Sequence, residues 1–226
     1  MRVLVTGADG FVGRHLVREL ASAGHEPISA VRPGGRAPET GRTVALELES
    51  GASVADAVAT WPDAIVHLAA VASGREARRD PVAAWAVNAT GTARLIEASM
   101  RLRDSRNADP LVLIVSTGEV YGEGPGVPRV ETDGLRPQSP YAASKVAAEF
   151  AALEAWWRTG LRVIVARPFP HTGRGQSPVY ALPAFVARLR EARATGKTEV
   201  DTGNLAPVRD LLDVRDVVRG YLALLD

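Results

Sequence analysis

Tyr141 and Lys145 are separated by three residues in the segment SPYAASK, which spans residues 139–145. Residues four apart lie on the same face of a helix, so the phenol and the ammonium group would be neighbours. A cationic ammonium favours the phenolate and lowers the pKa of the phenol. Such a phenol can pass a proton to or from a carbinol oxygen while a hydride moves at a nicotinamide ring. A Tyr-x-x-x-Lys pair also occurs often by chance, so its meaning depends on the rest of the chain.

A glycine-rich segment, TGADGFVG, lies near the other end of the chain over residues 6–13. Its glycines stand between an expected strand and an expected helix, which is the context of a dinucleotide-binding turn. There Gly7 permits a tight turn, Gly10 lets the backbone approach a pyrophosphate, and Gly13 lets the helix pack against the strand. The phosphates would lie at the helix N-terminus, where free N–H groups favour anions. We prefer this interpretation to a plain turn because both flanking elements are present.

The end of the second expected strand indicates which dinucleotide would bind. An acidic residue at this position would bind the ribose hydroxyls of NAD, but the segment ISAVRP over residues 28–33 contains none. Arg32 could instead pair with the 2′-phosphate of NADP, although a solvated loop arginine is the alternative. The expected cofactor is therefore NADP(H), with NAD(H) possible. Glu47 is a weaker candidate for an adenine contact, since a surface charge explains it as well.

A third group of polar residues follows the most apolar expected strand, in the segment STGEVYG over residues 116–122. Ligands of open α/β sheets bind beyond the carboxyl ends of the strands. A hydroxyl at Ser116 or Thr117 would therefore be placed to hydrogen-bond a substrate oxygen. Glu119 could serve as an additional acid or base, and an ordinary solvated carboxylate is an equally weighted alternative.

Strands and helices alternate along the chain, which predicts an α/β fold with a doubly wound, Rossmann-type parallel sheet and right-handed crossovers. The expected strands are residues 3–5, 27–31, 44–48, 64–69, 111–116 and 162–167. The expected helices are residues 11–23, 53–60 with Ser53 as N-cap, 81–103, 141–158, 182–194 and 214–225. Glycine and proline predict loops over residues 33–41, 122–128 and 168–181. We expect a dinucleotide-binding domain over residues 1–167 and a partial substrate-binding region over residues 168–226.

Composition excludes several classes of function. Lys and Arg number 27 against 26 Asp and Glu, so no basic field indicates nucleic acid or an anionic membrane as a partner. The chain has no cysteine, and its four histidines lack metal-ligand spacing, so no metal site is expected. No apolar run reaches the length of a membrane span, and the first residues lack the long apolar core of a signal peptide. A cytoplasmic enzyme is the expectation.

Together, the segments TGADGFVG, STGEVYG and SPYAASK resemble those of the extended short-chain dehydrogenase/reductases, the NAD-dependent epimerase/dehydratase family. The usual substrates of that family are nucleotide sugars. The resemblance continues through Asn88, through RPF and HTGRGQ over residues 167–176, and through residues 203–210. These last motifs are most similar to those of GDP-6-deoxy-4-ketohexose reductases, which form GDP-rhamnose. The resemblance implies a Rossmann fold with a small, shortened C-terminal substrate-binding portion.

The resemblance also implies roles for individual residues. Thr117, Tyr141 and Lys145 would form the catalytic triad, with Glu119 as a further acid or base. The implied cofactor contacts are Gly7, Gly10, Phe11, Val12, Gly13, Arg32, Glu47, Leu48, Leu68, Ala69, Ala70, Tyr141, Lys145 and Arg167. The implied substrate contacts are Asn88, Ser116, His171, Gln176 and Arg209. A bidentate guanidinium at Arg209 would suit a substrate pyrophosphate.

Three departures keep alternatives open. Pro170 stands where the family usually has an asparagine that helps to grip the sugar nucleotide, and proline offers no amide side chain. Thr117 and Glu119 also resemble the pair in sugar 4,6-dehydratases, where the glutamate assists water elimination. The relatives continue beyond the position of Asp226, so either the substrate domain is reduced or the sequence is incomplete.

The leading interpretation is a reductase in which NADPH delivers hydride to a 4-keto-6-deoxy nucleotide sugar and Tyr141 supplies the proton. A dehydratase or epimerase that uses Glu119 is the first alternative, and a ketoreductase of a secondary-metabolite pathway is the second. A non-catalytic cofactor sensor is disfavoured by the complete triad. The family resemblance implies a homodimer through helices 81–103 and 140–158, and Trp85, Trp156 and Trp157 are expected in the core.

Overall fold

The computed structural model describes residues 1–36, 38–106, 108–124 and 126–226. Its main sheet has six strands in the order β3-β2-β1-β4-β5-β6, and all five neighbouring pairs are parallel. The strands are β1 (Arg2–Thr6), β2 (Glu26–Val31), β3 (Arg42–Ala45), β4 (Ala64–His67), β5 (Leu111–Val115) and β6 (Val163–Ala166). This is the order of a doubly wound Rossmann sheet, so the predicted fold class is confirmed.

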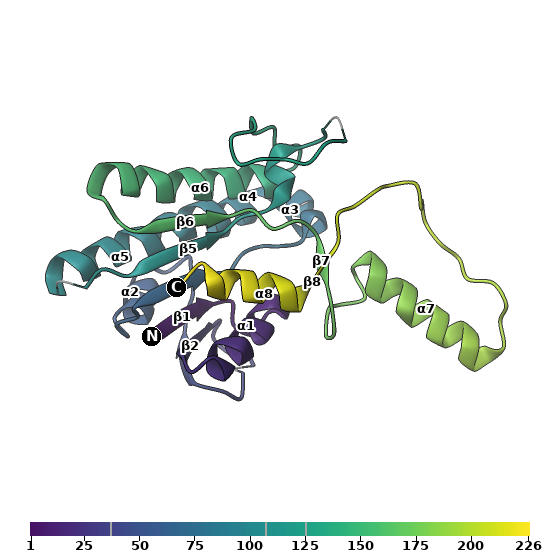
Figure 1. The fold of residues 1–226 in the computed structure, drawn as a ribbon, viewed down its shortest axis with the longest axis horizontal. Helices are drawn as coiled ribbons and strands as arrows, with labels where there is room; N and C mark the ends of the chain where they lie inside the picture. The colour runs from purple at the N-terminus through teal and green to yellow at the C-terminus, as the bar shows by residue number, and fades with distance from the viewer. Residues whose placement is uncertain (37, 107, 125) are drawn as a thin grey trace.

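Helices cover both faces of the sheet (Figure 1). On one face, α1 (Phe11–Ser22) and α8 (Val214–Ala223) pack against each other and against the strands. On the other face lie α2 (Gly51–Val58), α5 (Gly91–Arg106) and α6 (Pro140–Thr159). The apolar side chains of each strand alternate between the two faces, as the twofold period of a strand requires.

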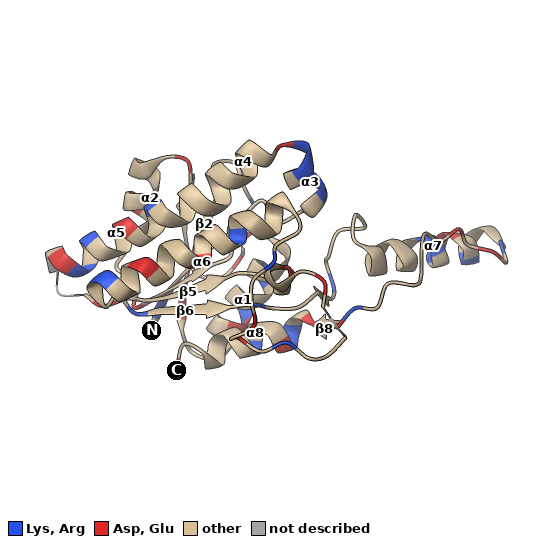
Figure 2. Ribbon diagram, turned by 90° about the horizontal axis from the view of Figure 1, so that it is seen from above, with Lys and Arg blue, Asp and Glu red and all other residues tan. Residues whose placement is uncertain are grey.

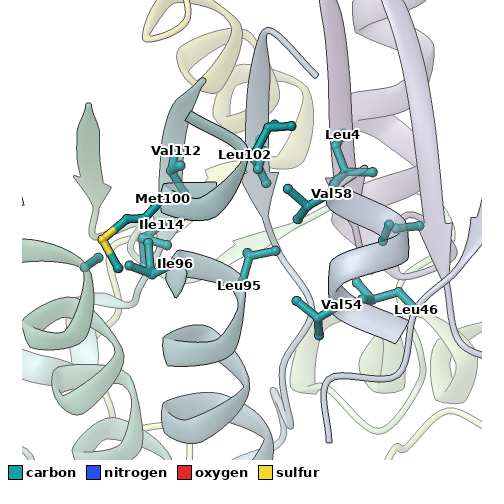
Figure 3. Close-up of a cluster of buried hydrophobic side chains, with 14 of the residues drawn as sticks. Leu4, Leu46, Val54, Val58, Leu95, Ile96, Met100, Leu102, Val112 and Ile114 are labelled. Atoms are coloured by element: carbon teal, nitrogen blue, oxygen red, sulfur yellow. The ribbon is translucent and has the colours of Figure 1, made fainter. Parts of the chain in front are cut away.

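The larger core cluster lies between the sheet and α2, α5 and α6, and Figure 3 shows it in close-up. Leu4 from β1 contacts this cluster, while its neighbours Val3 and Val5 belong to the cluster on the opposite face. Val54 and Leu95 project from α2 and α5 into the same space. Because both faces are buried, the strands are almost continuously apolar, which made them recognisable in the sequence.

The long helix expected over residues 81–103 is interrupted in its middle. It consists of α4 (Pro81–Trp85), a π-helical turn η1 (Ala86–Thr90) and α5, which runs on to Arg106. Asn88 lies in the π-helical turn and is buried. A π-turn adds a residue to the helix, and such turns are frequent near functional sites. The short helix α3 (Gly74–Arg79) precedes α4, and its three arginines are exposed, in line with a solvated helix face.

Several local predictions are wrong. The third strand covers Arg42–Ala45 instead of residues 44–48. The N-cap of α2 is Ser50, whose hydroxyl accepts the N–H of Ser53 at 3.3 Å, while the Ser53 hydroxyl accepts the N–H of Glu47 at 2.9 Å. The helix therefore starts earlier than the apolar pattern suggested. Both serine hydroxyls accept hydrogen bonds from backbone N–H groups. The presence of a serine alone therefore did not show which of the two is the N-cap.

Trp85, Trp156 and Trp157 are exposed by 43, 48 and 63%, so their expected core positions are wrong. The predicted loops over residues 33–41 and 122–128 include residues 37 and 125, which lie outside the described residues; the other residues of these loops form neither helix nor strand.

Figure 2 shows positive and negative residues interspersed along α5 and α6, in line with the nearly balanced charge. No described helix is both long and apolar enough to cross a membrane.

Part of the chain between β6 and α8 stands away from the layers (Figure 1). The segment expected as a loop over residues 168–181 contains a short strand, β7 (His171–Thr172), which pairs in parallel with β8 (Leu212–Asp213). Between them, α7 (Ala181–Thr195) and an extended segment over residues 197–211 stand away from the sheet (Figures 1 and 2). The chain then returns through α8 into the core. The outer segment is thus anchored at both of its ends.

Replacement of Gly13 by alanine should destabilise the fold. An added Cβ would lie 2.7 Å from the Cα of Ala8, inside the contact between α1 and the turn. Such overpacking costs about 1–3 kcal/mol of unfolding free energy. Gly220→Ala is the matched control, because Gly220 is exposed on α8 with open space around it and the change should stabilise by about 0.5–1 kcal/mol. Urea unfolding measures both, and equal effects would contradict the packing argument.

Candidate functional site

One cavity of about 1320 Å³ lies at the carboxyl ends of the strands, where open α/β sheets bind ligands. It is larger than a typical single-ligand pocket, so it has room for a dinucleotide and a second molecule. Most of the residues singled out in the sequence line it. They are Gly7, Gly10, Phe11, Val12, Gly13, Arg32, Glu47, Leu48, Leu68, Ala69, Ala70, Ser116, Thr117, Glu119, Tyr141, Lys145, His171, Gln176 and Arg209.

Asn88 and Arg167 are not among the described residues that line the cavity. The Asn88 side chain accepts the N–H of Val71 at 2.7 Å and donates to the Ser144 hydroxyl at 2.9 Å. It therefore ties the cavity-lining loop at Val71 to α6 from behind. Arg167 is held in an ion pair with the buried Glu149. Both residues support the wall of the cavity from positions outside it.

The glycine-rich turn brings backbone close to the strand ends. Gly7 has a φ of +67°, and a Cβ on it would lie 3.0 Å from the backbone N and Cα of Ala69. The N–H of Gly10 donates to the carbonyl of Gly7 at 3.0 Å, which closes the turn before α1. Within the described residues, no side chain caps the N-terminus of α1. Its first N–H groups are therefore available to an anion in the cavity.

A buried histidine on β4 holds the next part of the wall. The Ala69 N–H donates to the Thr6 hydroxyl oxygen at 3.1 Å, and the Thr6 hydroxyl and His67 Nδ1 are 2.8 Å apart. On the other side, His67 Nε2 lies 3.0 Å from the hydroxyl of Thr92, which donates to a backbone carbonyl at 2.6 Å. Because that carbonyl can only accept, Thr92 receives its bond from Nε2–H, and Nδ1 accepts from Thr6.

His67 is therefore neutral with its proton on Nε2. Burial is the main cause that lowers its pKa to about 3, and the positive charge of Lys145 acts in the same direction. In the sequence, His67 is only one of four histidines without metal-ligand spacing. The sequence signal for this role was a polar residue, His67, at the end of an otherwise apolar strand, since a buried polar side chain needs hydrogen-bond partners.

Thr117, Glu119 and Tyr141 surround the centre of the cavity. Thr117 is the N-cap of the short 3₁₀ turn η2 (Gly118–Tyr121), and its hydroxyl accepts the N–H of Glu119 at 3.2 Å. Thr117 also lies near enough to the phenol of Tyr141 to lower its pKa. Thr117 is buried, whereas Glu119 is exposed at the cavity. The threonine hydroxyl and the phenol can therefore both hydrogen-bond the same oxygen of a bound molecule.

The expected lowering of the Tyr141 pKa by Lys145 is wrong for this structure. Burial raises the pKa of Tyr141 to about 12, the negative charge of Glu119 adds to the rise, and the hydrogen bond with Thr117 opposes it. The phenol therefore keeps its proton at neutral pH. Lys145 is 3% exposed, and burial lowers its pKa to about 8 while the charge of Glu149 raises it.

Residues after β6 form the outer wall. The His171 ring stacks on Phe11 with their centroids 6.3 Å apart, and its Nδ1–H donates to the carbonyl of Phe169 at 2.9 Å. Gln176 donates to the His171 carbonyl at 3.1 Å and accepts from a neighbouring threonine. Arg209 lies on the extended segment, is exposed and lines the cavity. Its guanidinium donates to the carbonyl of the preceding residue at 2.8 Å.

Tyr221 on α8 is a cavity residue that the sequence analysis missed. It is 4% exposed, and its hydroxyl has no hydrogen-bond partner among the described residues. Burial raises the pKa of this phenol, and the nearby Tyr141 adds to the rise. The spacing of Val214, Val217, Val218 and Tyr221 marks one buried helix face, so a polar tip at the end of that face was the signal.

Comparison with known proteins agrees with this geometry. Residues 3–226 match the model of the NAD dependent epimerase/dehydratase family. GDP-6-deoxy-D-mannose reductase of Pseudomonas aeruginosa is 37% identical over 99% of this chain and 70% of the relative. The structure of RMD from Pseudomonas aeruginosa complexed with NADPH superposes with a TM-score of 0.80 at 36% identity, covering 99% of this chain and 71% of that one. UDP-glucose 4-epimerase of Thermus thermophilus in complex with NAD gives a TM-score of 0.83 at 31% identity, covering 100% and 74%.

Replacement of Tyr221 by phenylalanine should stabilise the free protein. A buried hydroxyl without a partner costs free energy, so its removal should raise the unfolding free energy by about 1 kcal/mol. Tyr121→Phe is the matched control, since the equally buried Tyr121 hydroxyl accepts a hydrogen bond from Arg167 at 3.0 Å. Its loss should destabilise by about 1.5–3 kcal/mol. Thermal unfolding of both variants checks the pair, and a destabilised Tyr221→Phe protein would contradict the assignment.

Proposed function

The chain belongs to the NAD dependent epimerase/dehydratase family, and from this membership we propose that it reduces a 4-keto-6-deoxy nucleotide sugar with NADP(H). A GDP-linked substrate is favoured because the reductase relative at 37% identity is named for one. The observation that carries the proposal is a single cavity shared by the glycine-rich turn, Thr117, Tyr141 and Lys145. It combines a dinucleotide cradle with a proton donor in one space.

The cavity fits a dinucleotide. The first N–H groups of α1 lack a side-chain cap within the described residues, and Gly7 and Gly10 line the cavity beside them, where a pyrophosphate would lie. Glu47 and Leu48 line the same side after β3 and would flank the adenine. When bound, the nicotinamide supplies the hydride. Lys145 and Tyr141 would orient its ribose.

Arg32 supports NADP(H) over NAD(H). It is exposed at the cavity after β2, and no acidic residue stands at this strand end to bind ribose hydroxyls. A guanidinium pairs with a phosphate through two parallel hydrogen bonds. One structural neighbour is complexed with NADPH and another with NAD, so the family accommodates both cofactors.

Tyr141 would act as the proton donor of the reduction. Burial raises its pKa to about 12, so the phenol is protonated at neutral pH and has a proton to give. Thr117 would hold the ketone oxygen through its hydroxyl while the C–O group becomes an alkoxide. The O–H bond of Tyr141 then breaks as the carbinol O–H forms.

Residues 168–226 would form the substrate-binding region. Arg209 would bind the substrate pyrophosphate, and His171 and Gln176 would contact the sugar nucleotide from the outer wall, where all three line the cavity. Ser116 would support the sugar side from the strand end. This division is interleaved, because α8 packs in the core of the dinucleotide-binding part against α1.

An epimerase or dehydratase is the second candidate function. Glu119 is exposed at the cavity and acts electrostatically on Tyr141, so it is placed to exchange a proton with a substrate. Such an enzyme would regenerate its cofactor in each cycle and consume no NADPH. A secondary-metabolite ketoreductase with a non-sugar substrate is a third candidate, and Pro170 at the cavity favours it.

A homodimer through helices 81–103 and 140–158 is part of the proposal. Val82 and Trp85 on α4 are 79 and 43% exposed, and Phe150 and Trp157 on α6 are 52 and 63% exposed. Large apolar side chains that remain in contact with water on packed helices support an interface.

Incubation with NADPH and a GDP-4-keto-6-deoxy sugar tests the reaction. The wild-type protein should consume NADPH and form a product two hydrogens heavier. Tyr141→Phe should lower kcat by about 10²–10⁴-fold, because the variant lacks the donated proton, while NADPH binding measured by fluorescence is retained. NADPH that binds without being consumed by the wild-type protein would refute the reductase and direct attention to the second candidate.

Substitution at Arg32 tests the cofactor preference. Arg32→Gln should weaken NADPH binding by about 10–100-fold, equivalent to one charged hydrogen-bonded contact, and leave NADH binding unchanged. Arg36→Gln is the control, since Arg36 lies in the same loop but is not among the described lining residues. Fluorescence titration with each cofactor measures the effect. An equal loss of NADH affinity would mean that Arg32 does not bind the 2′-phosphate.

A further inference from the structure

Glu149 is a buried carboxylate on α6 that the proposed reaction does not use. It is 1% exposed and lies one helical turn after Lys145. Its oxygens accept hydrogen bonds from the Ser116 hydroxyl at the end of β5 and from Arg167 at the end of β6. Arg167 Nε lies 3.1 Å from each carboxylate oxygen, and Nη2 lies 2.7 Å from Oε2. This geometry is that of a bidentate ion pair.

Arg167 is itself held on its other side. Its Nη1 donates to the Tyr121 hydroxyl at 3.0 Å and to the Glu131 carbonyl at 3.1 Å. The guanidinium also lies over the Tyr121 ring, 5.1 Å from the centroid. The ion pair therefore joins α6, the two strand ends and the turn after β5. Each of these segments carries or adjoins a residue of the proposed catalytic centre.

Lys145 and Glu149 are four residues apart on one helix, so their side chains project from the same face. Burial lowers the pKa of Lys145 to about 8, and the negative charge of Glu149 works against this fall. Without that charge, the lysine would lose its proton closer to neutral pH. The charge state of Lys145 near neutrality therefore depends on Glu149.

Two other titratable groups around Lys145 carry no charge near neutral pH. From β4, His67 is neutral because burial lowers its pKa to about 3. On α6, Tyr141 keeps its proton because burial raises its pKa to about 12. Glu119, from the turn after β5, acts on Tyr141 from an exposed position.

Two further phenols face the same region. Tyr221 from α8 is buried and its pKa is raised, and Tyr121 accepts a hydrogen bond from Arg167. Because its pKa is raised, Tyr221 places no charge beside the lysine near neutral pH. Among the described residues, the buried charge that acts on Lys145 is that of Glu149, which is itself paired with Arg167.

We propose that Glu149 is a positioning residue that keeps the Lys145 ammonium charged at the cavity. Arg167, which pairs with Glu149, partly neutralises the effect of the Glu149 charge on Lys145. The role of Lys145 in turnover rests on the proposed function, but its electrostatic dependence on this pair does not. The two partners should therefore act on Lys145 in opposite directions. A pair that served only to join the segments would give no such opposition.

The chain has only two lysines, Lys145 and Lys197, so lysine labelled with ¹³C at Cε gives two side-chain NMR signals. Titration of these signals reads the protonation of Lys145 directly, and the exposed Lys197 is an internal reference. Glu149→Gln should lower the Lys145 midpoint by about one pH unit, since a nearby opposite charge is lost. Arg167→Gln should raise it, because the Glu149 charge is no longer neutralised.

Glu154→Gln is the matched control, because Glu154 is an exposed carboxylate on the same helix that pairs with Arg158. It should leave the Lys145 midpoint unchanged. If Arg167→Gln fails to fold, Arg167→Lys keeps the positive charge and should leave the midpoint near that of the wild type. An unchanged midpoint in Glu149→Gln, or a shift of the same sign in Glu149→Gln and Arg167→Gln, would overturn the proposal.

Activity provides the second readout. With NADPH and the 4-keto sugar, the alkaline limb of the kcat/KM profile should move to lower pH in Glu149→Gln and to higher pH in Arg167→Gln. If the wild-type protein consumes no NADPH, the proposed function fails while the NMR titration still decides the inference. If turnover is normal and the profiles and midpoints do not move, the inference fails and the proposed function stands.

Discussion

Six parallel strands buried on both faces impose the constraint on which the rest of the molecule depends. Because all six run in the same direction, the loops that follow them meet at one edge of the sheet. The turn after β1, the Thr117 turn after β5 and the segment after β6 therefore share one cavity despite their separation in sequence. Close packing at Gly7 and Gly13 keeps this edge compact, since a Cβ at either position would meet neighbouring backbone. Strand direction thus decides where the cavity lies, and the side chains then decide its chemistry.

Burial determines the chemistry available at that edge. The phenol of Tyr141 and the imidazole of His67 are both held neutral, since desolvation disfavours their charged forms and moves each pKa accordingly. Lys145 is equally buried, yet it lies one turn from a carboxylate that is itself paired with Arg167. A proton donor and a cation can therefore coexist in a largely apolar wall. Isolated buried charges would be too costly, whereas a hydrogen-bonded pair is tolerated.

The C-terminal part joins this core through two short contacts. β7 pairs with β8, and α8 packs against α1, while α7 and residues 197–211 stand outside the layers (Figure 1). Gly173 belongs to this junction, since a Cβ there would contact Val214 and approach Phe11. The outer wall that carries His171 and Arg209 is consequently positioned by its ends.

The sequence by itself determined the alternation of elements, the doubly wound sheet, the glycine-rich turn and the proximity of Tyr141 to Lys145. These follow from apolar periodicity and short spacings, which act over a few residues. Only the tertiary structure decided that Arg167 and Asn88 stand behind the cavity wall, that Tyr221 enters it, and that burial raises the Tyr141 pKa. The physical reason is that desolvation and hydrogen-bond partnership depend on segments far apart in the chain. The local sequence pattern does not indicate which distant side chain will pack over a given group and exclude water from it.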